Sequence, residues 1–290
     1  MNKLLPTALP NRCDKERRKD HAEFLGTQVW AVPFLLLAAV LCAGQAPLPE
    51  PVTEQETEFG LAVYDELKAK GEIVESSALY DSLRPIAEAI SQVAQPRYDH
   101  PFKFFIVHEP HPNAFATPGG NVYVVDSLLY FVKNTEQLAG TLRHEVSHTI
   151  HRDAVHRLKE TQKIEGLEIG AALLLGPSIA HMLAIKMIGD LHSLAYSRDE
   201  ESRADVTGSD ICAATGYNPW GLVWLFEEFQ NADPKQIPQL LSDHPANETR
   251  IKTLQQHFRD NPSVFSKFDS RAESATQFVV AKDAGERFLR

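Results

Sequence analysis

The chain has 290 residues, 43% hydrophobic and 23% charged, a balance typical of a globular protein whose core needs no covalent staples. Its 39 acidic residues outnumber its 29 Lys and Arg residues and leave a net charge of −10, which argues against nucleic acid as a partner, because phosphate binding needs Lys and Arg. Cys13, Cys42 and Cys212 form no CxxC pair, which excludes a zinc ribbon and a thioredoxin-type site and leaves histidine and carboxylate as metal ligands.

Residues 1–44 have the pattern of an export signal or a membrane anchor. Six Lys and Arg residues lie within residues 1–28, and an uncharged run of 16 residues follows at 29–44. A basic segment before a short apolar run with small residues at its end is typical of a signal peptide. The run is short for a full membrane span, and the alternative is a disordered tail with one buried helix.

Two helices are predicted after this segment. Thr53 and Glu56 form a capping-box pattern that begins a helix running to about Lys70, with Gly71 just beyond its end. Helical spacing predicts a second helix that Pro96 ends, with its apolar stripe at Leu79, Leu83, Ile86, Ile90 and Val93.

Short strands and further helices follow along the chain. Residues 102–107 and 121–125 have β-type composition, and the loop at 110–120 between them is rich in turn residues. Further helices are expected at about 137–151, 191–214 and 220–231. Weak periodicity after residue 261 predicts a loosely packed C-terminal extension at 261–290. Few strands among many helices indicate a mainly helical α+β fold at 45–260.

The apolar stretch at 169–188 has the length of a membrane span. Its interruptions at Pro177, His181 and Lys186 are costly in lipid. We therefore expect a buried or membrane-touching helical element, and the alternative is a re-entrant or hairpin membrane segment.

The sequence His144-Glu145-Val146-Ser147-His148 predicts a metal site on a helix. Residues four apart share a helix face, so His144 and His148 can both bind one zinc ion. Glu145 then lies beside the metal, where a carboxylate can take a proton from bound water. An apolar stripe lies opposite, which lets one face pack in the core while the other lines a cleft: Leu138, Leu142, Val146 and Ile150. The alternative is a polar face with two solvated histidines.

A catalytic zinc site usually has a third protein ligand. His151 and Ala154 exclude one common arrangement, which needs glycine and histidine at these positions. The acid-rich segment 197–205 offers another, because Glu201 and Asp205 share a helix face. Glu201 would bind zinc, and Asp205 would accept the free ring N–H of a ligating histidine, His144 in the simplest arrangement. Without the histidine motif, this segment would be a solvated helix face.

Five segments resemble the M48 family of zinc metallopeptidases, in the same order along the chain: NAFATPGGNVYV at 113–124, HEVSH at 144–148, SRDEESRAD at 197–205, TGYNP at 215–219 and HPANETRI at 244–251. The resemblance implies a zincin-type domain with a small β-sheet and an active-site helix. It implies one zinc per chain on His144, His148 and Glu201, with Glu145 as base and Asp205 as the carboxylate behind a ligand. Asp153 departs from the family, which often has histidine there.

The resemblance is greatest to the periplasmic BepA-type branch, although we do not expect that branch's TPR repeats here. It implies that an edge strand pairs with the substrate backbone, here at Asn113, Ala114, Phe115 and Ala116. It also places His244 near zinc, where the ring either steadies the oxyanion or caps the metal.

The resulting hypothesis is a zinc metalloendopeptidase of the cell envelope, periplasmic or anchored in the inner membrane and facing the periplasm. Glu145 would activate a zinc-bound water, and the substrates would be unfolded or misassembled envelope proteins. Expected partners are polypeptides and the membrane surface or envelope complexes, with no nucleic acid. The main alternative is a zinc-bound chaperone or assembly factor in which His244 closes the metal site. A membrane-embedded CAAX-type protease fits less well, because the chain has at most two long apolar runs.

Overall fold

The computed structural model describes residues 51–157, 196–230, 240, 244 and 248–281, all within the unit Pro49–Arg290. The predictions for residues 1–44 and 169–188 lie outside these ranges. None of the helices within the described ranges is long and apolar enough to cross a lipid bilayer.

Helix α2 (Glu54–Ala69) begins at the predicted capping box. Thr53 Oγ1 accepts the Glu56 N–H at 3.2 Å, and a Glu56 carboxylate oxygen accepts the Thr53 N–H at 3.0 Å. Helix α3 (Leu79–Ala94) buries most of its predicted stripe, and a 3₁₀ turn containing Pro96 (Gln95–Arg97) follows it. Local capping therefore defines the start of α2, and apolar periodicity defines α3.

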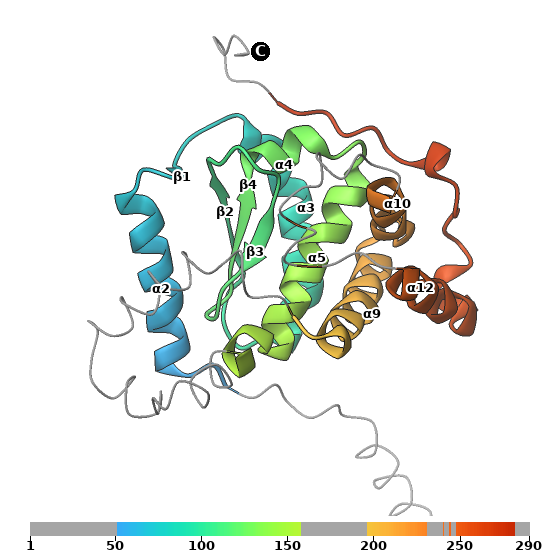
Figure 1. The fold of residues 1–290 in the computed structure, drawn as a ribbon, viewed down its shortest axis with the longest axis horizontal. Helices are drawn as coiled ribbons and strands as arrows, with labels where there is room; N and C mark the ends of the chain where they lie inside the picture. The colour runs from blue at the N-terminus through green and yellow to red at the C-terminus, as the bar shows by residue number, and fades with distance from the viewer. Residues whose placement is uncertain (1–50, 158–195, 231–239, 241–243, 245–247, 282–290) are drawn as a thin grey trace, which may run out of the picture. The chain divides into compact units, whose positions relative to one another are not determined.

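A four-stranded mixed sheet follows, in the order β1-β2-β4-β3. Its strands are β1 (Ile73–Val74), β2 (Lys103–Val107), β3 (Ala114–Ala116) and β4 (Asn121–Val125). Strands β2 and β4 correspond to the two predicted strands and run parallel, whereas β1 and β3 are antiparallel to their neighbours. Strand β3 lies within the predicted loop 110–120 and forms one edge of the sheet, beside α5 (Figure 1).

Alternation along the strands gives the sheet two apolar faces. Phe105 and Tyr123 pack with Phe59 and the other apolar side chains of α2. Ile106, together with its neighbours on β4, packs instead in the larger core that α3 and the later helices share. Figure 1 shows this layering, with α2 on one side of the sheet and α3 and α5 on the other. The predicted mainly helical fold with a small sheet is confirmed.

Among the described residues, the next four helices after β4 contribute to the larger core. They are α4 (Asp126–Phe131), α5 (Thr135–His151), α9 (Arg198–Thr215) and α10 (Trp220–Gln230). After these come α12 (Glu248–Asp260) and α13 (Pro262–Phe265). Helix α9 begins later than the predicted residue 191, because a Ser197–Glu200 capping box begins a new helix there.

Helix α5 lies at the centre and is buried on all sides between Glu136 and Thr149. The prediction that its histidine face lines a cleft is therefore wrong for the described structure, because α9 packs against that face. Glycines permit the close packing. A Cβ on Gly221 of α10 would lie 2.2 Å from the Glu136 carbonyl oxygen, and one on Gly208 of α9 would lie 3.3 Å from the Arg143 backbone.

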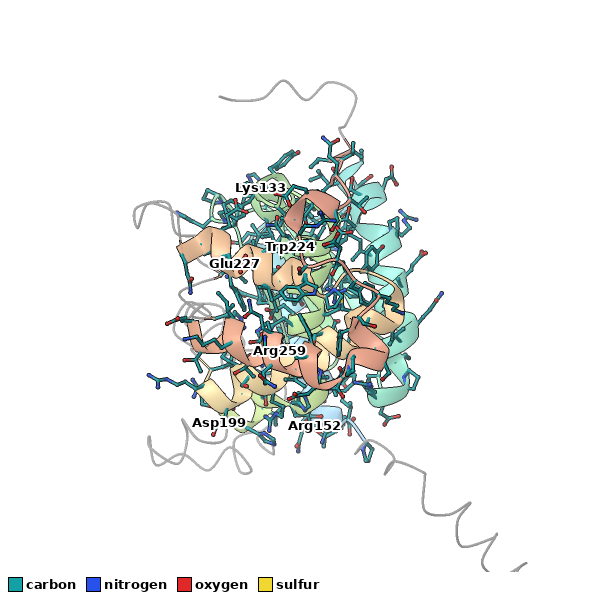
Figure 2. The ribbon with its side chains drawn as sticks, turned by 90° about the vertical axis from the view of Figure 1, so that its right-hand side faces the viewer. Lys133, Arg152, Asp199, Trp224, Glu227 and Arg259 are labelled. Carbon is teal, nitrogen blue, oxygen red and sulfur yellow. The ribbon has the colours of Figure 1, made fainter. Side chains whose placement is uncertain are left out.

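Residues 262–281 are mostly exposed and contact the helices at single points, so the loosely packed extension at 261–290 stays a prediction. Phe265 is buried in the larger core. Trp224 of α10, labelled in Figure 2, donates its Nε1–H to the Ser270 carbonyl at 2.8 Å. The Thr135 N–H, at the start of α5, donates to the Thr276 carbonyl at 3.0 Å. Single contacts with the helices, and not a periodic apolar face, position this segment.

Candidate metal centre

The two histidines of the HExxH sequence point from α5 toward α9. His144 and His148 lie one helical turn apart, and Glu201 faces them from the first turn of α9. His244 approaches from a separate segment. All four side chains are buried, although each carries a polar or ionisable group. Such groups are stable in a protein interior only when partners or a metal satisfy them.

The donor atoms of these four residues converge on one small volume. His144 Nε2 lies 3.0 Å from His148 Nε2, 3.2 Å from His244 Nδ1 and 3.3 Å from Glu201 Oε2. His244 Nδ1 lies 2.8 Å from Glu201 Oε1, and His148 Nε2 lies 3.7 Å from the same oxygen. Four ligands around a tetrahedral zinc, with bonds of about 2.0 to 2.1 Å, are about 3.3 to 3.4 Å apart. The observed set matches this spacing.

Each histidine of the motif has a carboxylate at its other ring nitrogen. His144 Nδ1 lies 3.0 Å from Asp205 Oδ1, and His148 Nδ1 lies 2.8 Å from Asp153 Oδ2. A carboxylate at Nδ1 favours the tautomer with its proton there. The two Nε2 lone pairs then face each other, which is unfavourable unless a cation lies between them. The residues present therefore fit a divalent metal.

Glu145 lies beside the donor set and outside it. Its Oε1 is 3.4 Å from His244 Nε2, and its side chain is buried. This is the arrangement that the sequence predicts for a base, because the carboxylate is close to the metal position without serving as a ligand.

Arg250 connects the carboxylates of the site. Its guanidinium donates to both Asp205 oxygens at 2.7 and 2.6 Å, and its NH1 lies 2.7 Å from Glu201 Oε2. NH1 also donates to the His244 carbonyl at 3.2 Å. A surface ion pair would contribute little, but Arg250 is buried. It therefore ties α12 to α9 and to the segment that carries His244.

The electrostatics of the site follow from burial and these contacts. Burial opposes the charged form of Glu201, but His244 and His144 outweigh it and hold the pKa of Glu201 well below its usual range. Burial likewise raises the pKa of Asp205, but Arg250 outweighs it and the net shift is downward. Both carboxylates are therefore ionised at neutral pH, as metal binding and hydrogen-bond acceptance require.

The two imidazoles differ in charge preference. Burial lowers the pKa of His144, but the carboxylates of Glu201 and Asp205 raise it overall to about 9. Burial and the neighbouring His144 and His244 together lower the pKa of His148 well below its usual value. His148 is therefore neutral near pH 7, the form in which imidazole binds a metal.

Two residues at the site were missed from sequence. Asp153 holds His148 Nδ1 and also contacts Arg203 of α9, although the sequence shows it only as a departure from the family. It follows Arg152, whose left-handed conformation (φ 58°) ends α5 and turns the chain back. Tyr196 stacks on the His148 ring, with centroids 3.9 Å apart and planes at 12°. Its position directly before the α9 cap carries no sequence signal for this role.

The predicted edge strand, β3, packs on α5, the helix that carries His144 and His148. The Leu240 N–H donates to the Pro112 carbonyl at 3.3 Å, and the His244 N–H donates to the Leu240 carbonyl at 2.9 Å. The segment that carries His244 thus meets the chain just before β3. The structure brings together all the predicted ligand and base positions, and β3 packs against the helix that carries three of them.

Comparison with known proteins matches residues 79–257 to peptidase family M48. The chain is 28% identical over 162 residues to the mitochondrial metalloendopeptidase OMA1 of Schizosaccharomyces pombe, covering 54% of this chain and 47% of that protein. It is 27% identical over 161 residues to the beta-barrel assembly-enhancing protease of Escherichia coli, covering 52% and 33% respectively. The chain thus spans half or less of the length of these relatives. Because the family match covers more than half of the chain, the chain belongs to peptidase family M48.

Proposed function

We propose that this M48 metallopeptidase is a zinc-dependent endopeptidase with Glu145 as its base. The observation that carries the proposal is the convergence of His144 Nε2, His148 Nε2 and a Glu201 oxygen, with the histidine nitrogens 3.0 Å apart and each Nδ1 facing its own carboxylate. His144, His148 and Glu201 would hold the ion. An imidazole and carboxylate set without sulfur suits zinc.

Zinc bound there would acidify a water molecule and polarise the scissile carbonyl. The protein's own residues supply the proton transfers. Glu145 takes a proton from the water and passes it to the leaving amine. Asp205 and Asp153 keep the two imidazoles oriented, and Arg250 keeps the Glu201 carboxylate in place.

His244 is central to the second candidate function. Its Nδ1 lies within the donor set, 2.8 Å from Glu201 Oε1, so the ring stands where a catalytic zinc site keeps a position for water. We propose that this is a closed arrangement, and that hydrolysis requires the ring to leave it. Its Nε2 faces Glu145, from where a displaced His244 can steady the oxyanion. If the ring never leaves, the protein is a zinc-bound chaperone or assembly factor.

We propose that the substrates are polypeptides, taken as extended chains along β3. The relatives named as a mitochondrial metalloendopeptidase and a beta-barrel assembly-enhancing protease support unfolded or misassembled cell-envelope proteins as the class. We also propose a location in the cell envelope, periplasmic or anchored in the inner membrane, with residues 1–44 as signal or anchor because of their basic and apolar pattern.

The test compares casein cleavage by the full chain, Glu145→Gln and His244→Ala at matched zinc content. The wild type should cleave and Glu145→Gln should be about 10²- to 10⁴-fold slower, because the general base is lost. Equal activity in these two would refute Glu145 as the base. An inactive wild type together with an active His244→Ala variant would show that His244 closes the site. Inactivity of all three with zinc bound would favour the chaperone alternative.

A further inference from the structure

A row of aromatic rings crosses the α2 face of the sheet and ends at β3, the edge strand of the sheet in the described residues. Tyr64 of α2 packs on Phe105 of β2 with ring centroids 4.8 Å apart. Phe105 packs on Tyr123 of β4 at 5.6 Å, and Tyr123 stacks on Phe115 of β3 at 4.8 Å with planes at 19°. Tyr123 is fully buried, whereas Phe115 at the end of the row is only partly buried.

The backbone of β3 can accept one more strand. Among the described residues, β3 pairs with β4 alone. The Val125 N–H donates to the Asn113 carbonyl at 3.0 Å, and the Thr117 N–H donates to the Asn121 carbonyl at 2.9 Å. Because ladder bonds alternate along an antiparallel pair, the polar groups of Phe115 also face β4. Those of the two alanines of β3 face outward. There the Ala114 N–H donates to the Asn113 side-chain oxygen at 2.8 Å, and an extended peptide can bind by replacing this bond and pairing with the other outward groups.

The side chains of β3 alternate between large and small. Ala114 and Ala116 are buried against the core on the α5 side of the sheet. Phe115 lies on the α2 side with the aromatic row. A peptide paired along β3 in either direction would present alternate side chains to these two faces. On the α5 side it meets methyl groups, and on the α2 side it meets one aromatic ring.

We propose that Phe115 is a specificity-determining residue that selects a large apolar or aromatic side chain in an extended polypeptide substrate. The proposal rests on the peptidase function proposed above. The backbone N–H and C=O of Phe115 face β4 and not the incoming strand. In antiparallel pairing, the substrate residue opposite Phe115 therefore belongs to a non-hydrogen-bonded pair. Side chains are closest in such pairs. An aromatic or large aliphatic residue there would cover the exposed part of the ring and extend the row by one member.

The first experiment profiles the cleavage sites of the full chain on a mixture of denatured peptides by mass spectrometry. The wild type should show enrichment of Phe, Tyr, Trp and Leu at one fixed distance from the cut. Phe115→Ala should lower this enrichment about tenfold, from the apolar contact that is lost. Phe115→Leu, the milder second variant, should retain aliphatic selection and lose aromatic selection. Tyr64→Ala, at the opposite end of the row, is the matched control and should leave the preference unchanged.

The second experiment measures binding without turnover. The Glu145→Gln chain is titrated with two labelled soluble peptides whose alternate residues are either Phe or Ala. Phe115→Ala in this background should weaken binding of the Phe peptide about tenfold and leave binding of the Ala peptide unchanged.

An unchanged preference in Phe115→Ala, or an equal loss in Tyr64→Ala, would overturn the proposal while leaving the peptidase function intact. A wild type that cleaves no peptide would instead contradict the proposed function. The binding comparison would then decide on Phe115 by itself, and equal affinities for the two peptides would overturn its role.

Discussion

The two sides of helix α5 are equally buried and chemically opposite. Leu138, Leu142 and Val146 lie fully buried on one side, and His144 and His148 lie buried on the other. Burial of a large aliphatic side chain contributes about 1.5 to 3 kcal/mol to stability. Burial of an ionisable group is costly unless it is paired. One side of α5 therefore stabilises the fold, and the other side supplies the candidate metal ligands.

The polar side depends on partners from distant parts of the chain. Asp205 and Arg250 come from α9 and α12, and Asp153 follows the end of α5. Breaking a buried ion pair is strongly destabilising, yet such pairs add little net stability compared with apolar packing. We therefore infer that the polar cluster serves metal binding. Substitutions on the aliphatic side should lower stability, whereas substitutions in the polar cluster should lower metal affinity.

The largest expected effect is on the aliphatic side. Leu142→Ala should lower the free energy of unfolding by about 2 to 5 kcal/mol, because it removes buried methyl groups and leaves a cavity. Chemical denaturation measures the loss, and zinc content per folded molecule should stay at the wild-type value. A loss of zinc without a loss of stability would contradict the division between the two sides.

The next largest effect is a loss of zinc affinity on substitution in the polar cluster. Asp153→Asn should weaken zinc affinity about 10- to 100-fold, because His148 loses the carboxylate that orients its ring. Its effect on the unfolding of the metal-free chain should be smaller than that of Leu142→Ala, since the Arg203 side chain is 47% exposed and can return to water. Competition with a zinc chelator measures the affinity.

Asp269→Asn is the control for Asp153→Asn, because it removes a surface carboxylate paired with exposed Arg271. It should leave zinc affinity unchanged. Equal affinities of the wild type and Asp153→Asn would show that Asp153 has no part in binding.

The smallest effect comes from the helix caps. Ser197→Ala and Thr53→Ala each remove a capping-box oxygen and should each cost about 1 kcal/mol in the free energy of unfolding. Only Ser197→Ala should also reduce zinc affinity, because Glu201 lies in the first turn of the helix that Ser197 caps. Equal zinc affinities for the two variants would indicate that the α9 cap does not position Glu201.

The parts of the site that the sequence predicts well are those encoded locally. The spacing of His144 and His148 is a property of one helix, and the spacing of Glu201 and Asp205 is a property of another. The two apolar strands were also located closely, since β-type composition is a local signal.

The parts that could not be predicted depend on contacts between distant residues. Asp153 reaches His148 only because Arg152 adopts a left-handed conformation at the end of α5. Tyr196 meets the His148 ring only after α9, which directly follows it, has packed against α5. The C-terminal segment lacks periodicity because it pairs with single groups, such as the Thr135 N–H, and forms no regular face.

The measurement that tests the central claim most directly is zinc binding by the full chain beside His148→Ala, with X-ray absorption at the zinc edge. We expect one zinc per wild-type chain with nitrogen and oxygen neighbours at about 2.0 to 2.2 Å and no sulfur, and loss of this site in His148→Ala. A chain that binds no zinc, or one that binds it equally well after His148→Ala, would contradict the account.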